Sequence, residues 1–588
     1  MKKIVELITA EVAKAFVAAE YDASYAKVTL SNRPDLCEYQ CNGAMAAAKV
    51  YRKSPLAIAG EIVEKMQENQ VFSEVAAVAP GFINIRLEAG FLTAYLQKMQ
   101  ADEHLSVTQA VPPKKIMIDY GGPNVAKPLH VGHLRSAIIG ESIKRMGRFL
   151  GHEMIGDVHL GDWGLQMGLI ITELKERKPE LVYFDEIFTG TYPQEAPFTI
   201  GELEEIYPAA SAKSKEDATF KEAAMQATFQ LQQGHRGYQG ILSHILEVSV
   251  TDLKKNYERL GVTFELWKGE SDVQHYVPEM IEEMKKEGYA RLDAGAWVVD
   301  VKEECDTKEI PPCIILKSDG ASLYTTTDLA TLIERMELFH PDEIIYVVDK
   351  RQDMHFTQVF RCARKTKLVN EDTGLRFLGF GTMNGKDGKP FKTREGGIMR
   401  LENLISDINE EMYRKITENH EIDPDEARVT ATTVGLSALK YGDLSNQAAK
   451  DYVFDIDRFT SFEGNTGPYI LYTIVRIKSI LTKYQNSGAV SDTAVIGNPV
   501  SISEKALMLV LANFNGVVEN AFEEIAPHKI CSYTYDLANA FNRFYHETKI
   551  LAETDEGQKA SWIRLLLLTK NVLECSIDLL GFTSPERM

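Results

Sequence analysis

Residues 115–150 constrain the fold more than any other part of the 588-residue chain, because the hydrophobic period changes within them. The apolar run at 116–118 is typical of a buried strand, and the Gly-Gly-Pro sequence at 121–123 indicates a tight turn. Apolar residues at helical spacing then continue to the end of the stretch. We therefore predict a strand, a glycine-rich turn and a helix, with Pro128 in the first helical turn.

The start of this predicted helix suits the binding of an anion. His130 and His133 are three positions apart, which places both imidazoles on one helical face, and Gly132 between them leaves the backbone accessible. Free backbone N–H groups and the positive end of the helix dipole attract phosphate at such a place. Lys127 adds a fixed positive charge just before the helix. We predict that these residues hold ATP and stabilise displacement at its α-phosphate.

Two histidines near a helix start are more often incidental than catalytic. The strand and the Gly-Gly-Pro turn before them are the context that ATP binding requires, and this context favours the functional interpretation. The segment PNVAKPLHVGHLRS also resembles the HIGH signature of class I aminoacyl-tRNA synthetases, in the form used by arginyl-tRNA synthetases. The resemblance implies a multidomain α/β protein with a Rossmann-like HUP catalytic domain.

The composition is that of an ordinary soluble protein, with 44% hydrophobic and 26% charged residues. We see no apolar run of membrane-spanning length and no signal peptide, so we expect a cytoplasmic protein without a membrane partner. The formal net charge of −20 argues against a general nucleic-acid binder, although local basic surfaces can still bind RNA. The seven cysteines lack zinc spacing, so we expect reduced thiols and no metal site.

The chain length suits roughly three to five domains of about 100–200 residues, and we predict three. Residues 1–110 form an α+β domain, because two alternating strands enclose alanine-rich helices. Residues 114–400 form the catalytic domain, with a charged helical insertion at about 185–270. Residues 401–588 indicate a bundle of α-helices.

Polar residues after two predicted strands of the catalytic domain suit a guanidinium, which needs carboxylate and carbonyl acceptors. Tyr324 and Asp328 follow one strand and Gln352 the other, and open α/β sheets bind ligands beyond their carboxyl ends. Taken alone, Asp328 could be a helix N-cap and Tyr324 part of the core. The resemblance implies that all three bind arginine, and that Asp119 and Asn124 contact its amino and carboxylate groups.

A glycine-rich basic loop occupies residues 379–397. Flexible backbone and clustered cations suit closure over a triphosphate, and the alternative is a solvated basic loop. The resemblance places a KMSKS-type loop here, but the sequence has no Lys-Met-Ser and keeps only a Thr-Arg end. We expect Lys389 and Lys392 to bind ATP, with Lys127 as the natural substitute for the missing lysine.

Two outer regions are predicted to bind tRNA. The segment with Tyr39, Gln40 and Asn42 resembles the N-terminal domain of arginyl-tRNA synthetases, which contacts the tRNA elbow, and the alternative is a folding module. Residues 462–469, FEGNTGPY, resemble the start of the family's anticodon-binding helical domain. Unpaired anticodon bases can stack on aromatic rings or arginine, and we expect the C-terminal Met588 near that site.

The resemblance implies a ligase with two reaction steps. Arginine attacks the α-phosphate of ATP to give arginyl-adenylate and pyrophosphate, and the 3′ end of tRNA(Arg) then accepts the arginyl group. Mg²⁺ accompanies ATP, no cofactor is tightly bound, and a monomer is expected. One alternative is a nucleotidyltransferase without tRNA, which the outer domains disfavour. The other is a non-catalytic tRNA-binding paralogue, which His130 and His133 disfavour.

Overall fold

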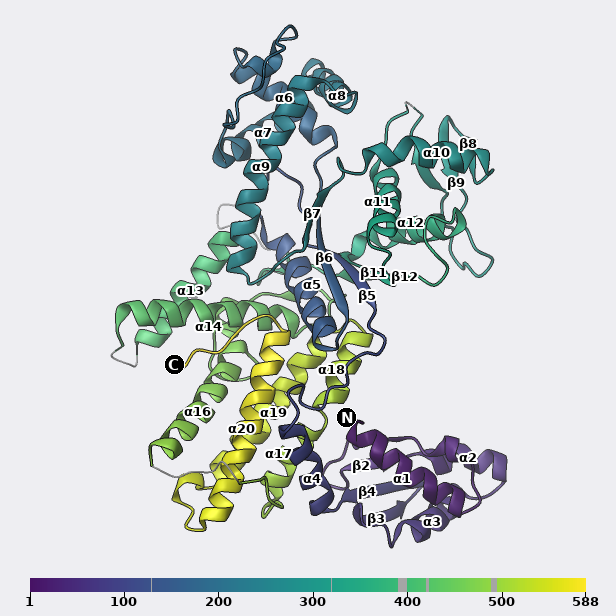
Figure 1. Ribbon diagram of the computed structural model, residues 1–588, viewed down its shortest axis with the longest axis vertical. Coiled ribbons are helices and arrows are strands. Elements are labelled where there is room, and N and C mark those ends of the chain that lie inside the picture. The colour runs from purple at the N-terminus through teal and green to yellow at the C-terminus, as the bar shows by residue number, and fades with distance from the viewer. Residues whose placement is uncertain (128, 319, 390–398, 419–421, 488–493) are drawn as a thin grey trace. The chain divides into compact units, whose positions relative to one another are not determined.

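The computed structural model describes residues 1–588 except 128, 319, 390–398, 419–421 and 488–493 (Figure 1). Contacts group the chain into two compact units. Unit 1 contains Met1–Gln109, Ser461–Leu579 and Thr583–Met588, and unit 2 contains Ala110–Thr460 and Leu580–Phe582. Within the described ranges, no helix is long and apolar enough to cross a membrane.

The central sheet of unit 2 has five parallel strands in the order β12–β11–β5–β6–β7. The first strand in the chain, β5, is central. The next two, β6 and β7, are added on one side of it, and the last two, β11 and β12, on the other side, so the direction of strand addition reverses between β5 and β11. Doubly wound sheets bind ligands beyond the carboxyl ends of the strands at this point. The strands are β5 (Lys115–Tyr120), β6 (Glu153–Leu160), β7 (Leu266–Gly269), β11 (Glu343–Asp349) and β12 (Gly374–Phe380).

The predicted strand and helix at the start of this sheet are present. The three apolar residues of β5 are buried, as expected for a central parallel strand, and α5 spans Val131–Phe149. Pro128, which is predicted in the first helical turn, lies outside the described residues. The helix begins at Val131, after His130, which is extended and forms an antiparallel bridge with Arg400.

Helices cover the sheet and form most of the rest of unit 2. Residues 185–270, the predicted insertion, contain α7, α8 and α9, and α13 packs against α14. Two short strands, β13 (Met383–Asn384) and β14 (Tyr452–Val453), pair in parallel. The helices are α6 (Leu165–Arg177), α7 (Ile200–Glu216), α8 (Ala218–Gln232), α9 (Arg236–Arg259), α10 (Val277–Lys286), α11 (Tyr324–Leu338), α12 (Asp353–Lys365), α13 (Leu401–Thr417), α14 (Pro424–Leu444) and α15 (Ile456–Phe459).

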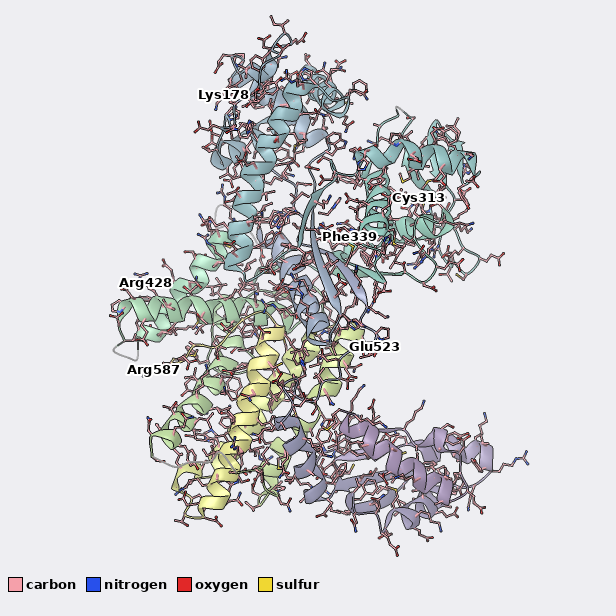
Figure 2. All side chains as sticks on the ribbon, viewed as in Figure 1. Lys178, Cys313, Phe339, Arg428, Glu523 and Arg587 are labelled. Atoms are coloured by element: carbon pink, nitrogen blue, oxygen red, sulfur yellow. The ribbon has the colours of Figure 1, made fainter. Side chains whose placement is uncertain are left out.

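A small antiparallel sheet, β10–β9–β8, lies beside α10, α11 and α12. Cys313 of β10 is buried in a hydrophobic cluster with residues of these helices (Figure 2). Its strands are β8 (Ala290–Asp293), β9 (Ala296–Val299) and β10 (Cys313–Leu316). All seven cysteines are free thiols, and five of them are buried.

The structure corrects the predicted surroundings of Tyr324 and Asp328. The strand before them, β10, belongs to the small antiparallel sheet and not to the parallel sheet. Tyr324 is the first residue of α11, which starts there because the Thr326 hydroxyl accepts the N–H of Leu323 at 3.1 Å. Asp328 therefore lies in the second turn of α11, and the N-cap interpretation is wrong.

Unit 1 combines an α+β region with a helical bundle. The four-stranded antiparallel sheet has the order β1–β2–β4–β3 and packs against α1, α2 and α3 (Figure 1). The elements of this region are α1 (Ile4–Ala18), β1 (Val28–Leu30), β2 (Tyr39–Cys41), α2 (Gly43–Tyr51), α3 (Pro55–Met66), β3 (Phe72–Val78), β4 (Phe82–Leu87) and α4 (Ala89–Gln100). The bundle contains α16 (Gly467–Asn486), α17 (Ile502–Ala512), α18 (Phe514–Glu523), α19 (His528–Glu547) and α20 (Glu556–Leu579).

Polar contacts hold the two regions of unit 1 together. The Lys505 ammonium of α17 lies 2.7 Å from Glu38 Oε1 and donates to the Leu87 carbonyl at 2.8 Å. Lys3 of the N-terminal region lies 2.6 Å from Glu519 of α18. The chain termini thus contribute to one compact unit although they are far apart in sequence.

Candidate active site

The two histidines of the signature cap helix α5. The N–H of Gly132 donates to Nδ1 of His130 at 3.0 Å, and the N–H of His130 donates to Nδ1 of His133 at 3.2 Å. Because both Nδ1 atoms accept, a neutral ring at either position carries its proton on Nε2. Burial and the nearby charge of Lys127 lower the pKa of His130. Burial, with the charges of His130 and Lys127, lowers the pKa of His133 to about 3.

These pKa directions make both rings neutral at pH 7, with Nε2–H groups that can donate to a ligand. The ring centroids are 3.9 Å apart, at the positive end of the α5 dipole. A Cβ at position 132 would lie 2.7 Å from Cε1 of His130, so any residue other than glycine requires the ring to move. The N-terminus of α5 therefore presents neutral donors to an incoming phosphate or ribose.

Ser136 of α5 joins the carboxyl ends of the two strands at the point where the strand order reverses. Its hydroxyl accepts the N–H of Gly121 at 2.8 Å and donates to the Val347 carbonyl at 2.6 Å. The sequence analysis did not single out Ser136, although it ends the quoted signature segment. No periodicity distinguishes such a bridge, because its partners come from strands far apart in the chain.

Asn124 and Lys127 lie on the turn between β5 and α5. Asn124 is exposed and bridges Gly161, and a Cβ at Gly161 would come within 2.1 Å of Asn124 Oδ1. Lys127 Nζ lies 4.4 Å from the ring centroid of Tyr207 in α7. The helical insertion therefore supplies an aromatic ring beside the cation at the phosphate end of the site.

A group of carboxylates lies beyond the carboxyl ends of β6 and β7. Asp162 accepts the Ser271 N–H at 2.9 Å and its hydroxyl at 2.5 Å. Burial raises the pKa of Asp162, and burial together with the charges of Asp162 and Asp328 raises the pKa of Glu270 to about 8. Crowded, desolvated carboxylates of this kind are stabilised by a bound cation. Sequence analysis missed Glu270, which is the residue directly after β7.

Asp328 of α11 belongs to the same group. Its Oδ2 lies 2.5 Å from Nε2 of His355 in α12, which orients the carboxylate. Gln352 is exposed at the end of a short 3₁₀ turn, Lys350–Gln352, directly after β11. The hydrogen bond between Asp328 and His355 joins α11 to α12, the helix that follows Gln352.

Tyr324 connects the two ends of the site. Its side chain is 67% exposed, and burial of the remainder with the charges of Glu270 and Tyr207 raises its pKa. Tyr207 contacts Lys127 at the phosphate end, and Glu270 lies near Asp328 at the acidic end. Tyr324 therefore lies within electrostatic range of Tyr207, which is beside Lys127, and of Glu270, which is near Asp328.

Asp119 lies at the carboxyl end of β5 and is half-buried. Its Oδ2 accepts Nη2 of Arg335 at 2.5 Å. The carboxylate predicted to contact the amino group of the substrate is thus already paired through one of its oxygens.

The described residues that follow the basic loop lie close to this site. Lys389 is exposed and accepts the Gly385 N–H at 2.8 Å through its carbonyl, whereas Lys392 lies outside the described residues. Beyond the gap, the Val131 N–H donates to the Met399 carbonyl at 3.2 Å. Met399, which follows the loop, therefore lies beside the histidine cap.

Metal binding was tested by the arrangement of possible ligands. Within the part of the chain that the structure describes, no three His, Cys, Asp or Glu side chains gather to hold a metal ion. The expectation that any Mg²⁺ is held mainly by ATP stays a prediction.

Comparisons with known proteins cover the whole chain. The family model described as tRNA synthetases class I (R), catalytic domain, matches residues 91–456. The arginyl tRNA synthetase N terminal domain matches residues 2–87, and the DALR anticodon binding domain matches residues 470–588. The chain belongs to the arginyl-tRNA synthetase family. The predicted family, fold class and ligase class are confirmed.

Relatives among the arginyl-tRNA synthetases extend over the full length. An arginine–tRNA ligase of Agathobacter rectalis is 64% identical and one of Alkaliphilus oremlandii is 57% identical, with 100% of each chain covered. The crystal structure of the Plasmodium falciparum arginyl-tRNA synthetase matches with a TM-score of 0.82 at 26% identity, covering 100% of both chains. The Thermus thermophilus enzyme has a TM-score of 0.78 at 21% identity over 100% of both chains, which shows the shared fold.

The residues predicted to contact the tRNA elbow lie in unit 1 with different accessibility. Tyr39 is fully buried and lines a cavity of about 1160 Å³ between the N-terminal sheet and the bundle. Gln40 is half-buried and donates to Asn84 Oδ1 at 2.9 Å, whereas Asn42 is exposed before α2. Met588 is half-buried at the end of the chain. Of the elbow residues, Asn42 is thus the most accessible.

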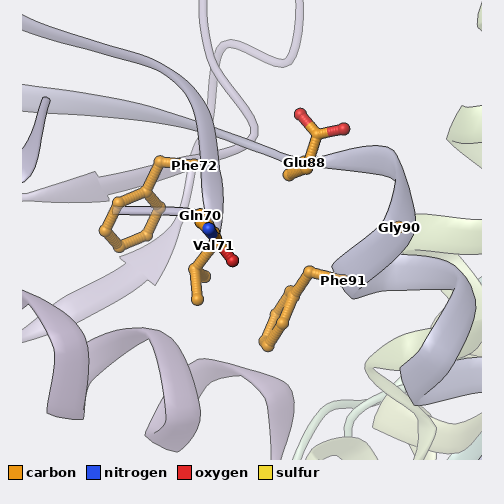
Figure 3. Close-up of a pocket in the computed structure, with 6 residues that line it drawn as sticks. All are labelled: Gln70, Val71, Phe72, Glu88, Gly90 and Phe91. Carbon is orange, nitrogen blue, oxygen red and sulfur yellow. The ribbon is translucent and has the colours of Figure 1, made fainter. Parts of the chain in front are cut away.

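A second recess of unit 1 lies between the start of β3 and the start of α4 (Figure 3). Its volume is about 710 Å³, and Phe72 and Phe91 line it from these two elements. The predicted elbow residues do not line this recess. It therefore adds no support to their predicted role in this arginyl-tRNA synthetase.

Proposed function

We propose that this protein activates arginine with ATP and transfers the arginyl group to tRNA(Arg). The observation that carries the proposal is the joining of two opposite environments in one site. A neutral, histidine-capped helix end suits the phosphates of ATP, and the carboxylates of Asp162, Glu270 and Asp328 suit a guanidinium. Family membership supports the same substrates.

The phosphate end supports displacement at the α-phosphate. The Nε2–H groups of His130 and His133 donate to oxygens that gain negative charge as the arginine carboxylate attacks. Gly132 leaves room for the ribose or base beside the backbone, and Lys127 adds a permanent positive charge. As pyrophosphate leaves, Lys389 and Lys392 of the basic loop stabilise its charge. The chemistry is therefore positioning and electrostatic stabilisation.

The acidic end holds the arginine side chain. Asp328 and Glu270 accept hydrogen bonds from the planar guanidinium, whose charge restores the ionised form of Glu270. Tyr324 lies against the side chain, and Gln352 adds a polar contact from the end of β11. Asn124 and Asp119 on the first strand and turn bind the substrate carboxylate and ammonium. This arrangement directs the carboxylate towards the histidine cap.

The surfaces of unit 1 support binding of tRNA. Arg476 of α16 lies 4.8 Å from the ring centroid of Tyr472 and 5.4 Å from that of Tyr545 in α19. Rings and guanidinium planes of this kind stack on unpaired bases, so we assign this face to the anticodon. We assign the elbow to Gln40 and Asn42, with Tyr39 supporting their strand from beneath, and Met588 to the anticodon end.

We further propose how the metal ion, cofactors, cellular location and oligomeric state enter the reaction. Mg²⁺ binds with ATP through phosphate oxygens and water, because hard cations keep such ligands when no protein cage is built. No tightly bound cofactor is needed for either step. The protein works in the cytoplasm as a monomer.

Charging of tRNA(Arg) with arginine and with citrulline tests the proposal. Citrulline has the shape of arginine but a neutral side chain, so buried carboxylates built for a cation should reject it by about 10³-fold or more in kcat/KM. Asp328→Asn should reduce this discrimination, whereas Asp306→Asn, which alters a carboxylate paired with Arg361, should leave it unchanged. Comparable use of both amino acids, or faster charging with another amino acid, would contradict the proposal.

A further inference from the structure

One face of α11 carries both candidate arginine ligands and a buried arginine. Arg335 follows Asp328 by seven residues and Tyr324 by eleven, which corresponds to about two and three helical turns. All three side chains therefore lie on one stripe of the helix. Tyr324 is exposed at the start of this stripe, and Arg335 is only 1% exposed at its end.

The Arg335 guanidinium joins α11 to two strands of the parallel sheet. Its Nη2 donates to Oδ2 of Asp119 on β5 at 2.5 Å and to Oδ2 of Asp157 on β6 at 2.7 Å. Its Cζ lies 5.3 Å from the ring centroid of Tyr346 on β11. One side chain thus contacts three adjacent strands, and on β5 it does so at Asp119, next to the last residue of the strand.

The ion pairs of Arg335 with Asp119 and Asp157 are a poor source of folding free energy. Burying an arginine and two carboxylates removes three charges from water, and well-packed apolar side chains of similar size are often as stable. In addition, Nε and Nη1 of Arg335 have no hydrogen-bond partner within the described ranges. Burial raises the pKa of Asp157, and the charge of Arg335 opposes that rise. The buried triad is therefore better explained by the geometry that it imposes than by the stability that it supplies.

We propose that Arg335 is a positioning residue for the amino acid end of the site. It holds Oδ2 of Asp119 and leaves Oδ1, which takes part in no hydrogen bond within the described structure, for the substrate ammonium. It also fixes α11 against β5 and β6, which sets the distance between Asp119 and the guanidinium ligand Asp328. The inference deepens the proposed function and rests on it, because it assumes that these residues bind arginine.

Steady-state kinetics of Arg335→Gln and Arg335→Lys test the proposal. Arg335→Gln should raise the KM for arginine about 10- to 100-fold and leave the KM for ATP within about twofold, because the phosphate end is unaffected. Arg335→Lys should lie between this variant and the wild type, since lysine keeps the charge but not the planar fork. Arg361→Gln is the matched control, because it removes an arginine–aspartate pair of the same unit away from the site.

A double variant separates positioning from general support of the fold. If Arg335 acts through Asp119, Asp119→Asn with Arg335→Lys should raise the KM for arginine no further than Asp119→Asn alone. Additive effects, an unchanged KM for arginine in folded Arg335→Gln, or equal rises for arginine and ATP would overturn the proposal. If Arg335→Gln does not fold, Arg335→Lys and the double variant decide the question. Failure of the wild type to use arginine would instead overturn the proposed function.

Discussion

At the scale of single residues, burial acts on the two ends of the site in opposite ways. It lowers the pKa of His133 to about 3, so the imidazole stays neutral and donates without repelling Lys127. It raises the pKa of Glu270 to about 8, so a carboxyl is kept partly protonated until a cation arrives. Titratable groups whose pKa is strongly shifted by burial and by a nearby charge are typical of functional sites.

The protonation of Glu270 predicts a pH dependence of arginine binding. Arginine favours the ionised carboxylate, whose pKa in the free protein is about 8, so affinity should rise as pH increases towards 8 and level off above it. The KM for arginine should rise by up to about tenfold for each pH unit below 8, with little change in the KM for ATP. Titration of KM between pH 6 and about 9 measures this effect.

Glu270→Gln is the control for this titration, because an amide has the same shape and does not ionise. The variant should have a higher KM for arginine and no pH dependence with a midpoint near 8. A wild-type KM that does not change with pH, or the same profile in the variant, would remove Glu270 from the arginine site.

The geometry of the α5 cap indicates that one methyl group added at Gly132 should lower activity. In Gly132→Ala the new Cβ would meet the His130 ring at 2.7 Å, so the ring must move and its hydrogen bond with the backbone is lost. We expect kcat for arginine activation to fall about 10²- to 10³-fold, as when an oriented donor is removed from a reaction centre. Gly164→Ala, at an open position before α6, should have little effect. Equal activity of the two variants would contradict this role of the cap.

At the scale of elements, the sequence predicts those parts that have a strong local pattern. The buried strand β5, the helix α5 and the helical insertion all show periodicities that local reasoning recognises. The prediction that Tyr324 and Asp328 follow a strand of the parallel sheet was wrong, because β10 pairs with β9 in the small antiparallel sheet. Ser136, Glu270 and Arg335 could not be found in this way, because their partners lie on strands distant in sequence.

We expect different losses of activity when lysines are removed from the turn before α5 and from the basic loop. Lys127 lies on the turn beside the histidine cap, whereas Lys389 is exposed in the basic loop. Lys127→Ala should lower kcat for arginine activation about 10²- to 10³-fold, and Lys389→Ala and Lys392→Ala by less than about tenfold. Lys215→Ala, at an exposed position of α7, is the control. A larger loss in either loop variant would assign the key cation to the loop.

At the scale of the whole molecule, local patterns predicted the α+β region and the helical bundle but not their association. The bundle is recognisable from long amphipathic segments, and the N-terminal strands from their alternation. The contact of Lys505 with Glu38 joins residues that are more than 400 positions apart, and no local pattern indicates it. The division into two units therefore depends on long-range pairing, which sequence reasoning of this kind does not capture.

The Lys505 contact predicts a selective effect on tRNA. Lys505→Ala removes the pair with Glu38 and the hydrogen bond with the Leu87 carbonyl, so the two regions of unit 1 are held less firmly for simultaneous contact with tRNA. We expect the KM for tRNA to rise about fivefold, which corresponds to about 1 kcal/mol, while the KM values for arginine and ATP stay unchanged. Lys14→Ala, which removes an exposed pair with Glu11, is the control. A rise limited to arginine or ATP would contradict the prediction.

Amino-acid-dependent exchange of pyrophosphate with ATP is the sharpest test of the proposed reaction, because it reports formation of the adenylate. The assay should be run with each amino acid, with and without tRNA(Arg). We expect exchange with arginine and with no other amino acid, in the presence of tRNA(Arg). Exchange without tRNA would keep the assignment and show that the site is already formed. No exchange by folded protein in either condition, or exchange that depends on another amino acid, would contradict the account.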